Sequence, residues 1–150
     1  MMKGNVKLRP SCTLFCNVSP SFISFGKGVE IGNHSTISSC NHIVIEDDVL
    51  TGPHVFIADH NHKYSDPNIP IANQGVECPS SNEVVIGQGS WLGTNVVVVG
   101  NVRIGKHCVI GANSVVTKDI PDYCVAVGIP AKVIKKFNFT TNKWHSTKEH

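Results

Sequence analysis

Charged and aromatic residues are scarce in this chain, at 16% and 7% of its 150 residues. This scarcity excludes a long coiled coil and a highly charged disordered chain. The 13 Lys and Arg residues stand against 11 Asp and Glu, which leaves a net charge of only +2. A charge that small gives no broad basic face, so we expect no nucleic-acid partner.

Long apolar runs are also missing. No stretch reaches the roughly 18 apolar residues of a membrane span, and the first ten residues are too polar for a secretory signal. The six cysteines, at positions 12, 16, 40, 78, 108 and 124, form no Cys-x-x-Cys pair, which argues against a zinc ribbon. We therefore expect a cytoplasmic protein with reduced thiols and no bound metal. The pattern indicates no role for Cys78.

An internal repeat is the strongest feature of the sequence. An aliphatic residue returns at every sixth position from residue 86 to residue 116, and glycine follows four of these six. The position four residues after each aliphatic residue is small or medium-sized. The repeated aliphatic residues are Ile86, Leu92, Val98, Ile104, Ile110 and Val116.

The same period occurs earlier in the chain. It runs through Phe25, Ile31 and Ile37, then resumes after an offset of two residues at Ile45, Thr51 and Ile57. A period of six fits neither a helix nor a plain amphipathic strand, but it fits a short strand plus a turn. Three such units close a triangular coil of 18 residues, and stacked coils lie about 4.8 Å apart. The sequence therefore predicts an all-β fold, a parallel β-helix of hexapeptide repeats.

Two segments break the repeat. Residues 61–83 contain three prolines and little periodicity, which is typical of a functional loop inserted into a regular solenoid. After residue 120 the repeat stops, and residues 130–136 are expected to form a short C-terminal cap. We therefore predict one domain at 1–136, with a loop insertion at 61–83, and a loose polar tail at 137–150.

Histidine marks the start of the insertion. His60 stands where the regular coil gives way to the loop, in the segment Asp59-His60-Asn61-His62. An imidazole that changes charge near neutral pH suits a general base, and a rigid coil beside a loop suits substrate access. The alternative is a surface histidine that makes an ordinary loop hydrogen bond. His54 is expected at a solvent-facing corner.

Several motifs in order resemble the hexapeptide-repeat acyltransferases, in particular the sugar O-acetyltransferases of the galactoside, maltose and capsular-polysaccharide group. The resemblance covers roughly residues 25–136 and is carried by the combination of motifs. These are Ile57-Ala58-Asp59-His60-Asn61-His62, Trp91-Leu92-Gly93, Thr117-Lys118-Asp119-Ile120-Pro121 and Gly128-Ile129-Pro130-Ala131-Lys132. The resemblance implies a left-handed coil.

The resemblance also implies an activity, the transfer of acetyl from acetyl-CoA to a hydroxyl or amine of a sugar. It implies His60 as the catalytic base, with His62 in reserve, and it assigns Asp59 and His62 to the acceptor. The N–H near Thr94 is the implied donor to the oxyanion. The remaining residues that it assigns to CoA are Trp91, Gly93, Gly111, Ala112, Thr117, Lys118, Lys132 and Lys135.

Family members form trimers with active sites between subunits, so we expect a homotrimer. Galactoside and maltose enzymes carry a longer helical N-terminal segment, and residues 1–24 show no such pattern. The acceptor is therefore not transferred from those enzymes, and a sugar of a surface polysaccharide, free or nucleotide-linked, is the expected class.

Three other functions stay open at the level of sequence. A zinc lyase like the gamma-class carbonic anhydrases needs three histidines around one metal, for which His54, His60 and His62 are the candidates. A non-enzymatic hexapeptide scaffold would not need the His, Trp and Lys residues that this chain has. An antibiotic acetyltransferase would keep the chemistry and change the acceptor.

Overall fold

The computed structural model describes residues 1–147, which form three parallel sheets and two small antiparallel additions. The four-stranded sheet contains β3 (Phe22–Phe25), β6 (His42–Ile45), β11 (Glu83–Ile86) and β14 (Val102–Ile104). The five-stranded sheet contains β2 (Thr13–Cys16), β5 (Thr36–Ser39), β8 (Phe56–Ala58), β13 (Val97–Val99) and β16 (Val115–Val116).

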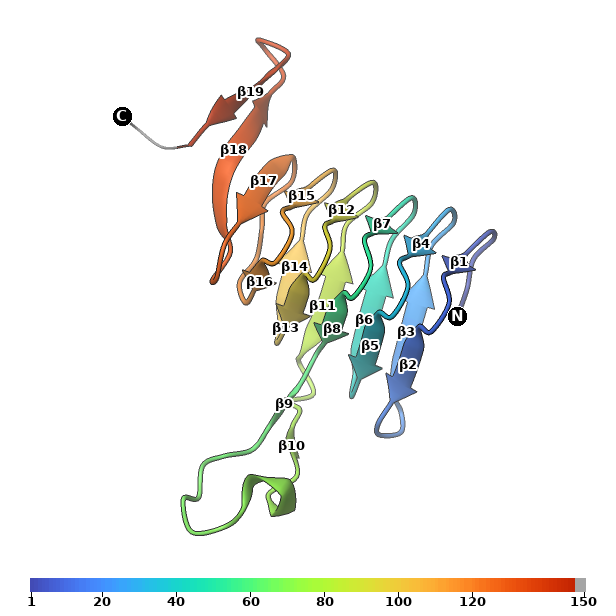
Figure 1. Cartoon of the computed structure of the whole chain (residues 1–150), viewed down its shortest axis with the longest axis vertical. Coiled ribbons are helices and arrows are strands. Elements are labelled where there is room, and N and C mark those ends of the chain that lie inside the picture. Colours follow the sequence, from blue (N-terminus) through green and yellow to red (C-terminus); the bar gives the residue numbers. More distant parts are fainter. Residues whose placement is uncertain (148–150) are drawn as a thin grey trace.

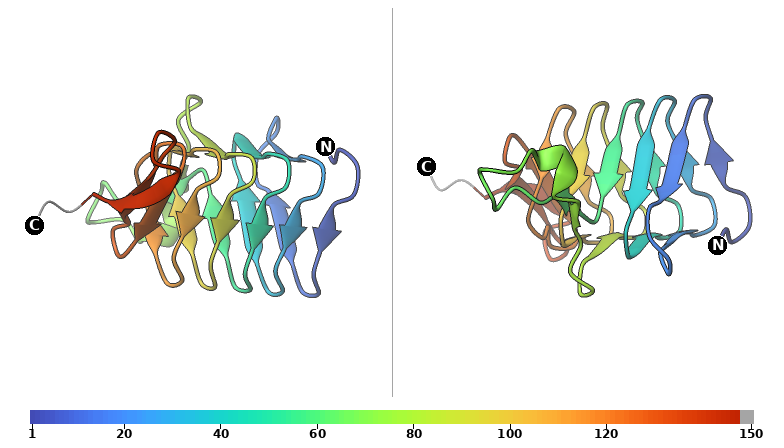
Figure 2. Two further views of the ribbon diagram at one scale, coloured as in Figure 1. Left: turned by 90° about the horizontal axis from the view of Figure 1, so that it is seen from above. Right: turned by 90° about the horizontal axis from the view of Figure 1, so that it is seen from below.

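The third sheet has eight strands. Its parallel part contains β1 (Lys7–Leu8), β4 (Glu30–Ile31), β7 (Leu50–Thr51), β12 (Trp91–Leu92), β15 (Val109–Ile110) and β17 (Cys124–Val127). The chain visits the eight-, five- and four-stranded sheets in that order and then repeats. This order winds the chain into stacked triangular coils, seen edge-on in Figure 1 and along two faces in Figure 2. The predicted parallel β-helix is confirmed.

The core consists of the residues that the six-residue period selects. Register partners stack one above another, as Ile45 with Ile86 and Ile104, and Leu92 with Ile110. All twelve periodic residues are buried, as are the small residues four positions later: Ser90, Val96, Val102, Cys108 and Ser114. The interior of the prism is therefore filled with columns of matched aliphatic side chains.

Thr51 is the polar exception among the periodic residues, and its hydroxyl has a defined partner. The Gly32 N–H donates to Thr51 Oγ1 at 2.9 Å, in the interior of the coil. The residue is buried like its aliphatic counterparts. A polar side chain is tolerated at this core position because its oxygen accepts a backbone hydrogen bond.

The insertion leaves the prism between β8 and β11 and projects away from the coils (Figure 1). It contains β9 (Asn61–His62), the 3₁₀ helix η1 (Ile71–Asn73) and β10 (Val76–Glu77), with β9 and β10 paired antiparallel. We call the edge of the prism from which it leaves the loop corner. This corner contains the turns between the five- and four-stranded sheets, at residues 40–41, 59–82, 100–101 and 117–119.

The C-terminal segment differs from the expectation. β18 (Lys132–Asn138) pairs antiparallel with β17 and caps the eight-stranded sheet, as the predicted cap required. The expected loose tail from residue 137 is wrong within the described residues, because β19 (Lys143–Ser146) pairs with β18. Aromatic contacts between Phe137 and Trp144 hold this hairpin together. Residues 148–150 lie outside the described part of the chain. Within residues 1–147 no helix is long and apolar enough to cross a membrane.

Candidate active site

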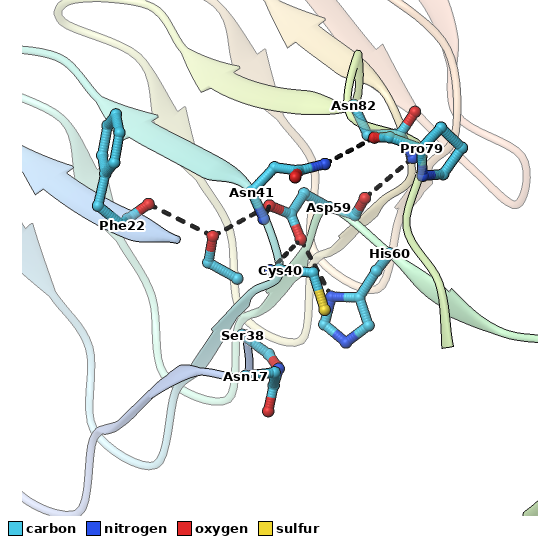
Figure 3. Close-up of polar contacts among 10 residues, drawn as sticks. Asn17, Phe22, Ser38, Cys40, Asn41, Asp59, His60, Pro79 and Asn82 are labelled. Atoms are coloured by element: carbon cyan, nitrogen blue, oxygen red, sulfur yellow. Dashed lines mark hydrogen bonds and ion pairs between the residues drawn. The ribbon is translucent and has the colours of Figure 1, made fainter. Parts of the chain in front are cut away.

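Asp59 and His60 lie in contact at the loop corner, where β8 ends and the insertion begins. His60 Nδ1 lies 3.0 Å from Asp59 Oδ1, and the side chain of His60 is 13% exposed while that of Asp59 is fully buried. Figure 3 shows the imidazole beside the Cys40 side chain, with one ring nitrogen joined to the Asp59 carboxylate. The pair therefore joins a buried carboxylate to an imidazole that still reaches the surface.

The Asp59 carboxylate is surrounded by hydrogen-bond donors. Cys40 N–H donates to Oδ1 at 2.7 Å, and Asn41 N–H and the Ser39 hydroxyl donate to Oδ2 at 2.8 and 3.0 Å. All three of these groups are donors, so the Asp59 oxygens act as acceptors in every one of these contacts. His60 Nδ1 therefore carries the proton in this contact, and Nε2 keeps its lone pair.

The insertion is tied to this pair at its returning end. Asn82 Nδ2 donates to the Asp59 carbonyl at 3.0 Å, and Asn41 Nδ2 donates to the Pro79 carbonyl at 2.6 Å. Both bonds join residues near the exit of the loop to residues near its entry (Figure 3). The position of His60 is thus fixed from the coil side and from the loop side.

Sequence reasoning missed Ser39, Cys40, Asn41 and Asn82. The sequence feature that marks Ser39, Cys40 and Asn41 is the offset of two residues in the six-residue period between Ile37 and Ile45. These extra residues form the turn that supplies the two N–H groups to Asp59. The contact between Asp59 and the acceptor stays a prediction; in the structure the Asp59 carboxylate is fully buried and its oxygens are bonded to groups of the same chain.

The other two candidate histidines do not converge on His60. His62 lies on β9 with an exposed side chain. His54 is exposed at a different corner, as expected, and its ring stacks on that of His34 at a centroid distance of 5.1 Å. The three histidines of one chain therefore do not form a metal site by themselves, and the zinc-lyase alternative would need histidines from two subunits at one interface.

The residues assigned to CoA fall into two groups. Most lie on the eight-stranded sheet or its edge: Trp91, Gly93, Thr94, Gly111, Ala112, Lys132 and Lys135. Trp91 and Lys135 occupy one outward column, through the register partners Val109 and Val125. Thr117 and Lys118 lie instead at the loop corner, with exposed side chains. Trp91 is half exposed.

The corner between the eight- and five-stranded sheets, which we call the Thr94 corner, has unpaired backbone N–H groups. Within residues 1–147 the N–H groups of Asn33, Thr94 and Ala112, which are equivalent positions in three coils, have no acceptor. At the equivalent place after the four-stranded sheet, the Lys27 and Lys106 N–H groups donate to Asp47 and Asp122 of the next coil, both at 2.8 Å.

Ala112 occupies the position at the Thr94 corner that corresponds to these aspartates, two residues after the inward Ile110. A methyl group offers no acceptor, so the Thr94 N–H stays available to a ligand. Packing explains why glycine stands at positions 93 and 111, since a side chain there would be too close to neighbouring atoms. A Cβ at Gly93 would lie 2.7 Å from Ala112 N, and one at Gly111 would lie 2.7 Å from Val127 Cγ1.

A coiled prism of six-residue units with a histidine-bearing loop at one corner is the architecture of hexapeptide-repeat proteins. Residues 83–118 match the family described as "Bacterial transferase hexapeptide (six repeats)". The chain is 44% identical over 129 residues to "Putative lipopolysaccharide biosynthesis O-acetyl transferase WbbJ" of Escherichia coli strain K12. That match covers 81% of this chain and 64% of the relative, so the chain spans less than two thirds of its length.

Two solved structures are also similar. A galactoside acetyltransferase in complex with coenzyme A has a TM-score of 0.79 and 29% identity, over 99% of this chain and 69% of that one. A maltose O-acetyltransferase from Clostridium difficile 630 has a TM-score of 0.62 and 31% identity, over 92% of this chain and 67% of that one. The chain belongs to the hexapeptide-repeat acyltransferase family. Its coil is accordingly the left-handed parallel β-helix.

Proposed function

We propose that the protein transfers acetyl from acetyl-CoA to a hydroxyl of a sugar in surface-polysaccharide synthesis, with His60 as general base. The observation that carries this proposal is the Asp59–His60 contact at the entrance of the insertion. Acetyl-CoA as donor is supported by the galactoside acetyltransferase bound to coenzyme A. The sugar acceptor is supported by the names of the relatives, which include a lipopolysaccharide biosynthesis protein.

The chemistry is a direct transfer. His60 Nε2 takes the proton of the acceptor hydroxyl as its oxygen attacks the thioester carbonyl carbon. Asp59 holds the ring through Nδ1 and stabilises the imidazolium that forms. When the carbon–sulfur bond breaks, the imidazolium returns the proton to the departing sulfur. Positioned base catalysis of this kind contributes about 100- to 10,000-fold to the rate.

The Thr94 N–H is the proposed donor to the oxyanion that forms on the thioester carbonyl. It is an unpaired backbone donor in a fixed turn, so it needs no rearrangement when negative charge develops. Trp91 is the proposed wall for the pantetheine. Lys132 and Lys135 are the proposed partners of the CoA phosphates, because they face outward on the same sheet.

The protein is proposed to act as a homotrimer. His60 lies at the loop corner, whereas Trp91 lies on the outer face of the eight-stranded sheet. A neighbouring subunit can bring a Trp91 face against a loop corner and so complete the site. The half-exposed side chains of Leu50 and Trp91, which are register partners, give this outer face an apolar surface.

The test is an acceptor screen with acetyl-CoA that records thiol release for the wild type, His60→Ala and His62→Ala. His60→Ala is expected to lose about 100- to 10,000-fold in kcat while it still binds CoA. His62→Ala is the matched control, because its exposed imidazole on β9 is not held by Asp59. Full turnover by His60→Ala, or no thiol release with any sugar, would contradict the proposal.

A further inference from the structure

A cavity of about 480 Å³ lies between the insertion and the coil, beside the Asp59–His60 pair. Most of its lining comes from the turn between β2 and β3, the turn at residues 40–41, and β10 with the residues that follow it. Cys40 lines this cavity, and ligand atoms of Cys40, Asp59 and His60 lie within 4.8 Å of one another. Figure 3 shows the Cys40 sulfur beside the imidazole. The cavity, which we call the inner cavity, therefore adjoins the proposed base.

A second cavity, which we call the outer cavity, contains residues farther along the insertion. It has a volume of about 420 Å³ and is lined by Lys63, Tyr64, Ser65 and Glu77. Lys63 and Glu77 also line the inner cavity, so the two cavities adjoin at these side chains. Both side chains lie on one face of the β9–β10 hairpin, because Glu77 is the register partner of Asn61 and Lys63 follows Asn61 by two residues.

The charges at this junction are balanced and unpaired. Lys63 and Glu77 are the only charged residues among those that line the two cavities. Within residues 1–147 neither side chain has an ion-pair or hydrogen-bond partner, so both are available to a ligand. A hydroxyl both donates and accepts hydrogen bonds, so neighbouring sugar hydroxyls suit an ammonium group and a carboxylate at one place. A phosphate or carboxylate on the ligand would be attracted by Lys63 but repelled by Glu77, with no net gain.

The uncharged lining fits sugar rings. Val18, Val76 and Pro79 give the inner cavity an apolar surface for the C–H groups of a ring. Tyr64 is 73% exposed and gives the outer cavity an aromatic ring on which a second sugar can stack. Sites for small ligands have volumes of about 300–1,000 Å³, so each cavity is large enough for one sugar unit.

We propose that the two cavities are adjoining subsites for an uncharged oligosaccharide, with the sugar that receives acetyl in the inner cavity and the next sugar in the outer one. Lys63 and Glu77 bind hydroxyls where the two units meet, and Tyr64 stacks on the outer unit. The acceptor is therefore a glycan chain rather than a free monosaccharide or a sugar nucleotide. The acceptor role rests on the proposed function, whereas oligosaccharide binding does not.

Ligand charge tests the two residues at the junction. Full-length protein is titrated, with NMR detection of the ligand, with methyl glycosides of neutral hexoses, with the matching uronic acids and with UDP-glucose. The wild type is expected to bind the neutral sugars most tightly. Glu77→Gln and Lys63→Gln should each weaken that binding about 10-fold, which is the value of one hydrogen bond to a charged group.

The two substitutions should also shift the preference for charge in opposite directions. Glu77→Gln removes a repulsion and should raise the affinity for uronic acids relative to neutral sugars, whereas Lys63→Gln should lower it. A merely structural effect would not give opposite signs. Lys27→Gln is the matched control, because Lys27 is an exposed lysine in the turn between β3 and β4 and should change neither affinity.

Chain length tests the outer subsite. For each neutral sugar that binds, the wild type should bind the corresponding di- and trisaccharides more tightly than the monosaccharide. Tyr64→Ala is expected to weaken binding of the longer chains about 2- to 10-fold, the value of one aromatic contact, and to leave monosaccharide binding unchanged. Phe139→Ala is the matched control, since Phe139 is an exposed aromatic residue near the C-terminal hairpin.

Kinetics with acetyl-CoA separate this inference from the proposed function. All three substitutions should raise the KM for the glycan and leave the KM for acetyl-CoA unchanged. Tighter binding of anionic probes than of neutral sugars, equal affinity for short and long chains, or no sugar binding would overturn the subsites. So would transfer to a sugar whose KM none of the three substitutions changes. Oligosaccharide binding with the expected shifts but without acetyl transfer would overturn the proposed function alone.

Discussion

At the scale of single residues, the site depends on a carboxylate that is costly to bury. Asp59 is fully buried, and an ionised carboxyl group is stable there only if its lone pairs are occupied. Two backbone N–H groups, one hydroxyl and one imidazole occupy them. Because the buried carboxylate needs a partner for each oxygen, it holds the His60 ring through Nδ1, which leaves Nε2 as the free acceptor.

Asp59→Asn is predicted to lower kcat and to leave the KM for acetyl-CoA unchanged. The amide keeps the size of the carboxyl group but presents an NH₂ to groups that are themselves donors, so the ring loses its partner. An unsatisfied buried group costs about 1–3 kcal/mol, which thermal unfolding should detect. Ser39→Ala is the control, because it removes one donor to Oδ2 and keeps the contact with His60. If Asp59→Asn retained the wild-type kcat, Asp59 would have no positioning role.

At the scale of elements, the sequence period predicted the strands better than it predicted the site. The periodic residues alone placed three sheets and the core, since an inward side chain every six residues leaves little freedom to the coil. In that pattern the offset of two residues before Ile45 is only an interruption of the repeat. Its function, two N–H groups directed at Asp59, was not predictable because hydrophobic spacing carries no information on the direction of a backbone donor.

The C-terminal hairpin was missed for a related reason. Residues 138–143 are mostly polar, which favoured a tail, but the flanking aromatic residues meet across the hairpin. Phe137 contacts both Phe139 and Trp144, and Tyr123 contacts Phe139 from the prism. β18 also pairs with β17, and the local sequence pattern does not predict this antiparallel pairing.

The Thr94 corner gives a prediction at the same scale. Ala112→Asp places at this corner a carboxylate equivalent to those of Asp47 and Asp122, which accept hydrogen bonds from backbone N–H groups of the preceding coil. The new carboxylate should accept from the Thr94 N–H and so make it unavailable to the oxyanion. Loss of one oxyanion donor lowers kcat by about 100- to 1,000-fold. Asn33→Asp is the matched control, because it adds the same charge at the same corner but two coils away from Thr94, on its N-terminal side. Steady-state kinetics with equal losses in both variants would show that charge, not capping, is responsible.

At the scale of the whole molecule, the prism separates the two halves of the proposed site. The loop corner carries His60 with Thr117 and Lys118, and the outer face of the eight-stranded sheet carries Trp91 with Lys135. A coil of this kind does not fold one edge onto another face, because its turns are held by backbone hydrogen bonds to neighbouring coils, as from Asn95 N–H to the Pro53 carbonyl and from Asn113 N–H to the Thr94 carbonyl. In the proposed homotrimer a second copy of the chain brings the two halves together.

Mixed trimers test this arrangement. His60→Ala and Trp91→Ala subunits, co-expressed in equal amounts, are predicted to recover about a quarter of the wild-type turnover, because random assembly pairs an intact His60 with an intact Trp91 at that frequency. Each variant alone should be nearly inactive. The control mixes His60→Ala with Asp59→Asn, whose defects lie on the same half and cannot complement each other. Purified mixed trimers with no more turnover than this control would mean that each site is built from one chain.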